Sequence, residues 1–596
     1  MRHAANKTAA TITIVDMGNA ANAYTCAAGA SSYLWLDPET GTISFTHRAD
    51  PATTTAAPGS GYLLTDVSKD GGATWNNNLG PVYTPSGAMN ARYPMNVVYN
   101  PNGNTDPDST RVVYGAPVLG GTNGATAWGN FTYGTYTVGT GAITSHVDTS
   151  NSERNFEVSD DMHAIRDGGE MFVIHRDRNY SLTNIFQNKL ILSRLTYSGG
   201  DVTAVHDSIS HVTSMTVDTT NVIPTDAAIA FSPNGNTGWI SVITHTSFSL
   251  EADSSYYLAL YKSTDGGATW GSMIEVPIST LPGIGDSLNP LNDTTYTIFT
   301  TAFDHDLAVD KNGNPHVFVA VGHGSNAWTI STGAGYWGLF DIYSADGGTT
   351  WAQRLVAKPQ TFRGSYGNGA NVIDEDPRPQ IAVTPDGNKL FFVWFDTDTT
   401  TFGPDANLFR DCFMQGYDVT TGFTTKMHDH PTYPGTSTYN YTAGTDADGV
   451  VNFANVSYYA KDDGSGNYCV PVNYMAVPDV GNTLQAVAFK YIDGLCVTES
   501  DFTGVVEKEN NVFAITNSYP NPFSDQTTVT VELKKTAKVR LTVTNILGQV
   551  IMSQDYGQLI AGRHGLTILR KEMNSGIYFA TVEADGFSVS QKLVVR

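Results

Sequence analysis

The chain has 596 residues, of which 15% are charged, 11% are aromatic and 58 are Gly. This composition excludes a coiled coil, which is rich in Ala, Glu, Lys and Leu, and a highly charged disordered chain. The formal net charge is −24, and residues 1–511 alone carry −27, so we expect no nucleic acid partner, because this part repels a phosphate backbone. The sequence contains no apolar run of 18 residues, and we therefore expect no membrane-spanning helix.

The first expected strand is the alternating segment TITIV at residues 11–15. After it, from about residue 30 to residue 495, a plan of four short strands recurs along the chain. The first turn of each repeat follows an apolar strand and contains Gly, and a second turn lies about 30 residues later. The glycines of the first turns are Gly41, Gly103, Gly168, Gly235, Gly313, Gly387 and, more weakly, Gly449.

Three of the second turns share nearly the same letters. Residues 68–75, 263–270 and 344–351 read SKDGGATW, STDGGATW and SADGGTTW, and each follows an alternating strand. This pattern predicts a β-hairpin turn, because Asp accepts backbone N–H bonds across a turn and Gly adopts a positive φ. We expect the Trp side chain to pack beneath the turn.

Four-stranded units repeated in phase indicate an all-β protein built as a β-propeller, because an array of unrelated sandwiches would not keep two classes of turn in register. The repeats predict seven blades. Six is the alternative, because the seventh repeat is the weakest. The strand at residues 11–15 is expected to close the ring by pairing into the last blade.

The three turn segments resemble the Asp-boxes, or BNR repeats, of sialidases and other bacterial propeller proteins. The resemblance implies a propeller fold and a structural role for the boxes, with Asp70, Asp265 and Asp346 as the turn aspartates. Each box joins the third and fourth strands of its unit. In such families catalysis takes place on the opposite face, where the loops between units lie.

Near residue 510 the composition changes, and residues 515–596 predict a separate immunoglobulin-like β-sandwich. Its letters include YPNPF at 519–523, SGIYF at 575–579 and KLVV at 592–595. This segment closely resembles the type A C-terminal sorting domain of type IX secretion. The resemblance implies the type IX secretion machinery as a partner, and a protein that is secreted or held on the outer cell surface of a Gram-negative bacterium.

The residues that precede the first strand of each unit should surround the mouth of the central channel. Four successive units place carboxylates there, and like charges about 8 Å apart repel by about 2 kcal/mol per pair at an effective dielectric near 20. Either their pKa values rise, or arginines pair with them, or a cation such as Ca²⁺ binds. The structural alternative is that the aspartates accept N–H groups from neighbouring units. The candidate ligand-binding residues are Arg92, Asp161, Asp226, Asp306, Asp376 and Arg378, and the four aspartates are also the candidate metal ligands.

A sialidase-like glycoside hydrolase is the alternative function. Such enzymes clamp the substrate carboxylate with three arginines, for which Arg92, Arg363 and Arg378 are the candidates. Tyr366 and Glu375 are the candidates for their Tyr–Glu nucleophile pair. The sequence departs from the family, because the first blade reads SYLW where an Arg-Ile-Pro element is expected. The charge of −27 also suits an anionic substrate poorly.

The four cysteines, Cys26, Cys412, Cys469 and Cys496, allow three pairings. They are either buried free thiols or, as suits an exported chain, they include at least one disulfide. A bond between Cys26 and Cys496 would join the two ends of the propeller body.

We expect a propeller at residues 1–505, a linker at 506–514 and the sorting sandwich at 515–596. The expected function is extracellular binding, or structure and assembly, in which the loop face contacts a glycan, a surface protein or a second copy of the chain. No catalytic residue is assigned, and the only cofactor considered is Ca²⁺.

Overall fold

A computed structural model of the chain divides into two compact units, residues 1–503 and residues 504–596. Within its described part no helix combines the length and apolar character that a membrane crossing needs. Most of the linker expected at 506–514 lies outside the described residues. The structure describes residues 12–27, 32–120, 126–179, 185–212, 224–246, 255–288, 298–324, 330–332, 335–399, 406–425, 428–429, 437–502, 513–545, 549–571, 573–584 and 587–596.

The first unit contains antiparallel sheets that follow the predicted repeat, and we number them sheet 1 to sheet 7 in chain order. In sheets 1–5 four strands pair in the order in which they occur in the chain. Sheet 1 contains β2 (Leu34–Leu36), β3 (Ile43–Arg48), β4 (Leu63–Ser68) and β5 (Asn76–Tyr83). Sheet 2 contains β6 (Met95–Tyr99), β7 (Arg111–Leu119), β8 (Trp128–Thr137) and β9 (Ile143–Thr149). Sheet 3 contains β10 (Phe156–Ala164), β11 (Met171–Asn179), β12 (Ile185–Ser198) and β13 (Asp201–Ser210). Sheet 4 contains β14 (Asp226–Phe231), β15 (Gly238–Thr244), β16 (Tyr257–Ser263) and β17 (Ile274–Glu275). Sheet 5 contains β18 (Phe299–Val309), β19 (Pro315–His323), β20 (Trp337–Tyr343) and β21 (Ala352–Ala357).

The last two sheets depart from this plan. Sheet 6 has three strands, and an isolated bridge between Tyr417 and Thr424 stands where the fourth is expected. Sheet 7 takes its outermost strand from the N-terminal end of the chain, with Thr13 opposite Asp493, which confirms the predicted pairing. The strands are β24 (Gln380–Val383), β25 (Lys389–Thr397) and β26 (Arg410–Asp418) in sheet 6, and β29 (Asn452–Val456), β32 (Val472–Ala476), β33 (Val487–Asp493) and β1 (Thr13–Ala20) in sheet 7.

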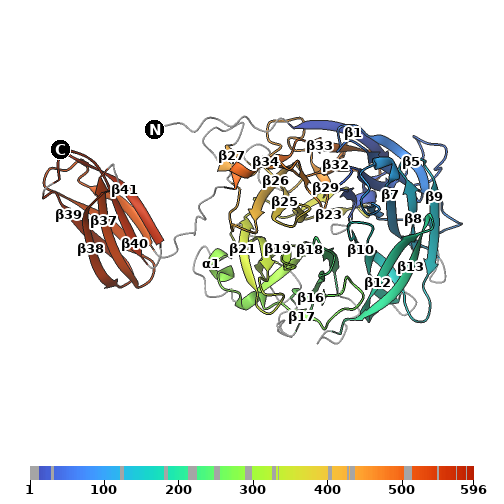
Figure 1. The fold of residues 1–596 in the computed structure, drawn as a ribbon, viewed down its shortest axis with the longest axis horizontal. Coiled ribbons are helices and arrows are strands. Elements are labelled where there is room, and N and C mark those ends of the chain that lie inside the picture. Colours follow the sequence, from blue (N-terminus) through green and yellow to red (C-terminus); the bar gives the residue numbers. More distant parts are fainter. Residues whose placement is uncertain are drawn as a thin grey trace. The chain divides into compact units, whose positions relative to one another are not determined.

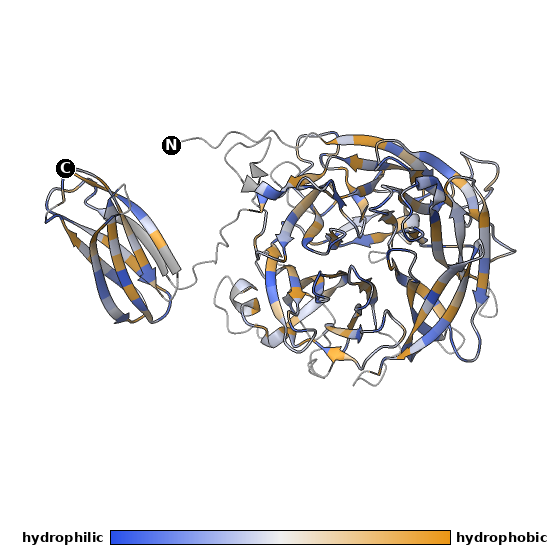
Figure 2. Cartoon of the chain, in the orientation of Figure 1, coloured by the Kyte–Doolittle hydropathy of each residue, from blue (hydrophilic) through white to orange (hydrophobic). Residues whose placement is uncertain are grey.

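The seven sheets stand around a common axis (Figure 1). The first strand of each sheet contacts the first strand of the next, and β29 of sheet 7 contacts β2 of sheet 1, so the ring is closed. The inner strand β14 is buried along its whole length, whereas the outer strand β9 alternates exposed and half-buried residues. Figure 2 shows the corresponding bands of polar and apolar residues along the outer strands. A strand packed on both faces is mostly apolar and carries buried polar side chains only where they find partners, whereas a strand that meets water needs a polar face.

The predicted second turns form as expected. Asp70 Oδ1 accepts the backbone N–H of Thr74 at 2.9 Å, and Ser68 Oγ accepts that of Gly72 at 2.8 Å. Gly71 and Gly72 have φ of 72° and 98°, which a residue with a side chain rarely adopts. The turns of Asp265 and Asp346 repeat these bonds.

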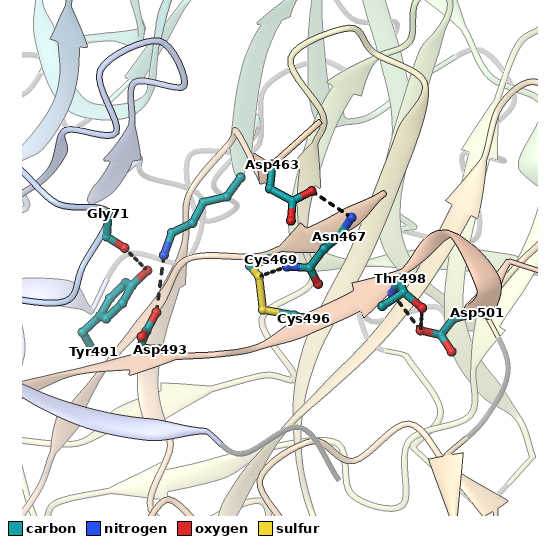
Figure 3. Close-up of a disulfide and its surroundings, with 10 residues drawn as sticks. Gly71, Asp463, Asn467, Cys469, Tyr491, Asp493, Cys496, Thr498 and Asp501 are labelled. Atoms are coloured by element: carbon teal, nitrogen blue, oxygen red, sulfur yellow. Dashed lines mark hydrogen bonds and ion pairs between the residues drawn. A yellow bond between two sulfur atoms is a disulfide. The ribbon is translucent and has the colours of Figure 1, made fainter. Parts of the chain in front are cut away.

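The disulfide joins Cys469 to Cys496, across a small sheet of β31 and β34 (Figure 3). The pairing of Cys26 with Cys496 is therefore wrong, and Cys26 and Cys412 are buried free thiols. The reason is register: Cys469 lies directly opposite Cys496 in this sheet, with a Cα–Cα distance of 4.0 Å. Cys26 instead lies at the end of a short 3₁₀ turn, where its thiol is fully buried.

Short elements connect the sheets of the first unit. The helical ones are η1 (Ala23–Cys26), η2 (Pro107–Ser109), η5 (Ile278–Thr280), α1 (Ile284–Leu288) and η6 (Glu499–Asp501). The short strands are β22 (Gly364–Tyr366), β23 (Ile373–Glu375), β27 (His428–Asp429), β28 (Ser437–Thr438), β30 (Lys461–Asp462), β31 (Asn467–Cys469) and β34 (Cys496–Thr498).

The second unit has its own core between two antiparallel sheets. Along β36 and β37 buried apolar residues alternate with more exposed ones, as expected for strands with one face on a core. One sheet contains β35 (Phe513–Tyr519), β36 (Gln526–Leu533) and β39 (Gly562–Leu569), and the other contains β38 (Val550–Leu559), β37 (Ala537–Asn545), β40 (Gly576–Ala584) and β41 (Phe587–Val595).

Candidate functional site at the ring axis

Three of the predicted aspartates lie on inner strands at the axis, Asp161 on β10, Asp226 on β14 and Asp306 on β18. Each of them bonds to the neighbouring sheet. Asp161 Oδ2 accepts the N–H of Ile229 at 2.9 Å, and Asp306 Oδ2 accepts that of Ile381 at 2.7 Å. These carboxylates therefore hold sheet 3 to sheet 4 and sheet 5 to sheet 6.

Three further junctions use an aspartate–histidine pair, an amide and a hydroxyl. Asp226 Oδ2 lies 2.8 Å from Nδ1 of His305 and joins sheet 4 to sheet 5. Gln380 Oε1 accepts the N–H of Val456 at 2.8 Å, which joins sheet 6 to sheet 7. The ring closes where Ser457 Oγ accepts the N–H of Leu36 at 2.8 Å. The axial polar residues thus satisfy backbone donors that would otherwise be buried without a partner.

Burial raises the pKa of three of the carboxylates at the axis, Asp160, Asp161 and Asp306. Burial raises the pKa of Asp161 well above its ordinary value, and the negative charge of Asp306 raises it further. Burial raises the pKa of Asp306 to about 7, although it accepts two backbone N–H groups that lower it. Burial also raises the pKa of Asp160 to about 8, against the opposing effect of Arg176, whose Nη2 lies 2.9 Å away.

The space between these carboxylates is small. Asp161, Asp306 and His163 line a cavity of about 20 Å³ at the axis, which is room for one water molecule. His163 is buried, its pKa is lowered to about 3 by burial, and its Nε2 has no hydrogen-bond partner within the described residues. The cavity therefore has no room for a sugar ring or a peptide side chain.

Aromatic side chains fill the channel beside this cavity. Tyr458 of sheet 7 crosses the ring: its hydroxyl donates to the carbonyl oxygen of Phe231 in sheet 4 and accepts the N–H of Val309 in sheet 5, both at 3.3 Å. Trp35 stacks on Tyr458 with ring centroids 5.8 Å apart, and His163 meets it edge-on at 4.5 Å. The axis is thus a packed core and not an open channel.

Arg378 and Glu375 belong to a buried network that joins sheet 6 to sheet 7. Arg378 is 1% exposed, and its guanidinium donates to the carbonyl oxygen of Cys26, to Glu375 Oε1 and to Asn455 Oδ1, at 3.0–3.1 Å. Arg410 donates to the carbonyl oxygens of Glu375 and Asp376. These groups bind each other, so they do not form a clamp that is open to a ligand.

The other candidates for a glycosidase site are also engaged. Arg363 pairs with Asp376 through two contacts of 2.5 and 3.1 Å. Tyr366 is buried and donates to Asn452 Oδ1 at 2.6 Å, and burial raises its pKa to about 12. The structure places Tyr366 near Glu375 but offers its hydroxyl to an amide, not to that carboxylate.

Arg92 stands apart from the axial aspartates, in the loop between β5 and β6. It is half-buried, its Nη1 donates to the carbonyl oxygen of Ala91, and burial lowers its pKa. The next residue, Tyr93, has a φ of 41°, and its ring lies 6.0 Å from that of Trp128. Arg92 is a predicted site residue that remains partly exposed, in the loop that joins sheet 1 to sheet 2.

The four aspartates do not converge on one point. Within the described ranges no group of three or more His, Cys, Asp or Glu side chains has the spacing to hold a metal ion. Asp161 and Asp306 face a common cavity, Asp226 bonds to His305, and Asp376 pairs with Arg363. Calcium binding by this set stays a prediction.

Sequence reasoning missed the neutral members of the axial network. Gln380, Ser457 and Tyr458 carry no charge and fall in no motif, although Gln380 directly precedes an apolar strand, as the aspartates do. Arg410 gives no such signal, because it lies in the third strand of its sheet and not beside the first.

The family described as the secretion system C-terminal sorting domain matches residues 517–596. The chain is therefore secreted and attached to the outer cell surface of a Gram-negative bacterium. No curated protein matches the chain.

Several solved structures are similar in part. PorZ, a surface component of the type IX secretion system of Porphyromonas gingivalis, is 13% identical with a TM-score of 0.33, and the match covers 95% of this chain but 59% of PorZ. The NanB sialidase from Streptococcus pneumoniae is 12% identical with a TM-score of 0.32, over 81% of this chain and 70% of that one. A microbial sialidase, Hz136, is 12% identical with a TM-score of 0.31, over 82% and 75%.

Proposed function

We propose that this chain is a seven-bladed β-propeller of the Asp-box type, displayed outside the cell as a binding or assembly protein. Its blades are sheets 1 to 7, with β1 as the closing strand. Residues 1–505 form the propeller, 506–514 the linker, and 515–596 an immunoglobulin-like sandwich that engages the type IX secretion machinery. Recognition uses the loop face, with a glycan, a surface protein or a second copy of the chain as the partner.

The filled axis is the observation that carries this proposal. Enzymes that act at the axis of a ring need a pocket that buries most of the substrate, and the cavity here is about 20 Å³. The carboxylates that would serve as acid and base accept backbone N–H groups or pair with arginine. A rigid disc with variable loops is suited to binding through its surface.

Two charge-reversal variants, at opposite ends of the strands, test whether recognition takes place on the loop face. Arg92→Glu changes the loop face, and Lys69→Glu makes the same change in an Asp-box turn, where Lys69 Nζ pairs with Asp108 at 2.9 Å. We expect Arg92→Glu to weaken attachment of purified protein to outer-membrane vesicles, or its assembly into arrays seen by electron microscopy, at least about fivefold. Lys69→Glu should leave both unchanged. Equal effects of the two variants would contradict recognition by the loop face.

An activity assay tests the alternative function, which is glycoside hydrolysis. The full chain is incubated with fluorogenic sialosides, galactosides and xylosides, and no turnover above buffer is expected. Turnover that disappears in Arg92→Glu would establish glycoside hydrolysis and replace the proposal.

A further inference from the structure

Two arginines lie close together where sheet 1 meets sheet 2. Arg48 is the last residue of β3, and Arg92 lies in the loop that joins β5 to β6. In the pairing of β3 with β4, Arg48 stands opposite Leu63, at the start of β4, whereas the Asp-box turn follows the end of that strand. Arg48 therefore lies at the end of sheet 1 that is opposite to the Asp-box turn.

One backbone hydrogen bond fixes the two guanidinium groups near each other. The N–H of Ala91 donates to the carbonyl oxygen of Gly61 at 3.1 Å. Beside Gly61, Arg48 donates through Nε and Nη2 to the carbonyl and hydroxyl oxygens of Ser60, at 2.7 and 2.8 Å. On the other side of the bond, Arg92 Nη1 donates to the carbonyl oxygen of Ala91 at 2.8 Å. The loops thus hold two positive charges side by side.

These charges have no counter-ion among the described residues. The remaining contact of Arg48 runs from Nη1 to Asn22 Oδ1, at 3.3 Å, so the acceptors of both arginines are oxygens of uncharged groups. Asp50 follows Arg48 by two positions, but its carboxylate accepts from Asn19 Nδ2 at 2.7 Å. Arg48 is 4% exposed, and a buried charge without a partner of opposite sign is costly.

The two arginines repel each other. Burial lowers the pKa of Arg48 to about 9, and the positive charge of Arg92 lowers it further. Burial also lowers the pKa of Arg92. The body as a whole carries −27, but exposed charges more than about 8 Å away are largely screened at physiological ionic strength. The nearby arginines therefore favour an anion of single charge at this point, although the whole body disfavours a highly charged one.

Aromatic side chains lie beside Arg92. Burial raises the pKa of Tyr93, and the charges of Arg48 and Arg92 lower it, so its hydroxyl lies near both arginines. The ring of Tyr93 lies 6.0 Å from that of Trp128, and Arg92, Tyr93 and Trp128 are each half-buried and thus partly open to solvent. An arginine fork suits a carboxylate, and an aromatic ring with a polar tip suits a ligand that has both an apolar face and hydroxyl groups.

We propose that this arginine pair binds the carboxylate of a hexuronic acid unit in an acidic saccharide. Arg92 donates to the carboxylate, Tyr93 and Trp128 contact the sugar ring, and the buried Arg48 strengthens the attraction through its charge without touching the ligand. The site lies at the junction of sheets 1 and 2 and performs no chemistry. The inference rests on the loop-face recognition proposed above, and it names the class of ligand.

The test uses isothermal titration of the full chain with the methyl glycosides of glucuronic and galacturonic acid. Methyl glucoside and methyl galactoside are the matched ligands, because a hydroxymethyl group replaces the carboxylate. We expect saturable binding of at least one uronide, at least about tenfold tighter than its neutral counterpart and weaker at high salt. Arg92→Gln should weaken uronide binding at least about tenfold, and Arg48→Gln about threefold, since only a distant charge is lost.

Arg154→Gln is the matched control. Arg154 is a half-buried arginine in the corresponding loop between β9 and β10, and its Nη1 donates to the carbonyl oxygen of His206 at 3.2 Å. Its removal takes the same charge from the chain and should leave uronide binding within about twofold of the wild type.

Failure of both uronides to bind, equal affinity for a uronide and its neutral counterpart, or tighter binding of an acidic peptide or of inorganic phosphate would overturn the proposal. Equal effects of Arg92→Gln and Arg154→Gln would also overturn it. Arg92→Gln changes a half-exposed loop residue and keeps the test decisive if Arg48→Gln does not fold.

The result also separates this site from the function on which it rests. Vesicle attachment that is lost in Arg92→Glu, without any binding of uronides, would overturn the uronide site alone. Uronide binding that is lost in Arg92→Gln, while Arg92→Glu leaves vesicle attachment and assembly unchanged, would support the site and contradict the proposed recognition by the loop face.

Discussion

Asp66 and Asp70 stand four residues apart at the end of one strand, yet they are held by different parts of the chain. Asp70, in the turn, bonds to Ser68 Oγ and to the N–H of Thr74. Asp66 is fully buried and accepts the N–H of Gly18, 48 residues away, at 2.7 Å. The turn aspartate is fixed by its own segment, whereas the buried one is fixed by the fold.

The same contrast separates the turn face from the ring axis. At the turns the bonded residues lie within five positions of each other, so one short sequence motif contains both partners of each hydrogen bond. At the axis the donor to Asp306 lies 75 residues away. An aspartate in a turn therefore bonds to nearby residues of its own segment, whereas an aspartate at the axis bonds to residues far away in the sequence. We expect substitution of these two kinds of aspartate to change stability by different amounts.

Among the substitutions proposed, removal of the Asp66 carboxylate should lower the free energy of unfolding the most. Asp66→Ala leaves the N–H groups of Gly18 and Asn78 and the ring of His47 without their acceptor. We expect the free energy of unfolding to fall by about 3–5 kcal/mol, because each buried unsatisfied group costs about 1–3 kcal/mol. All nine Trp lie before residue 395, so Trp fluorescence in urea reports the first unit alone.

A substitution at Gly18 supports the same test. A Cβ atom there would lie 2.6 Å from Asp66 Oδ1, so Gly18→Ala should also destabilise the seam between β1 and sheet 1. If Asp66→Ala costs no more than Asp70→Ala, the contrast between the two aspartates is wrong.

The pH dependence of Asp306 tests the axis directly. Its pKa is raised to about 7 in the folded protein, so the folded state holds the proton more tightly than the unfolded state does. Its contribution to stability is therefore present below about pH 4 and is lost as the pH rises toward about 8, by up to about 4 kcal/mol. Asp306→Asn has no such titration, and the advantage of the wild type over this variant should shrink with rising pH in urea titrations. An advantage that grows with pH would contradict the raised pKa.

Breaking the disulfide removes a long-range contact of another kind. Cys469 and Cys496 are 27 residues apart, and closing a loop of that length stabilises the folded state by about 3 kcal/mol. The double variant Cys469→Ala, Cys496→Ala should lose about that much. Dithiothreitol should lower the urea midpoint of the wild type and leave that of the double variant unchanged.

Asp70→Ala should lower the free energy of unfolding the least. Asp70 is largely exposed, and water can replace the bonds that its carboxylate makes to Ser68 and Thr74. We expect a loss of about 1 kcal/mol or less, measured by the same fluorescence. Thr74→Val is the control, because it removes the Thr74 hydroxyl, one of the three groups that bond to the Asp70 carboxylate, and should cost no more than Asp70→Ala.

Much of the repeat could be predicted from the sequence, because its signals are local. The glycines at 71, 235 and 387 adopt the positive φ that their turns require, and the alternation along the outer strands follows from one exposed face. The pairing of the N-terminal strand with β33 followed from the need to close a ring.

The partners of the axial residues could not be predicted from the letters. The positions of Asp161 and Asp306 follow from the repeat, but their acceptance of N–H groups from the next sheet depends on how neighbouring sheets pack. Tyr458 gives no signal in the sequence, although it crosses the channel and meets two other sheets. The Cys469–Cys496 pairing likewise depends on a register between strands that no motif encodes.

The sequence by itself determined the repeat, the turns and the C-terminal sorting module, because each rests on residues close together along the chain. Only the tertiary structure decided that the axis is filled, that its carboxylates bond to neighbouring sheets, and that one of two nearly identical turns buries its indole N–H without an acceptor among the described residues. The physical reason is that these features depend on groups tens to hundreds of residues apart, whose distances are set when the ring closes.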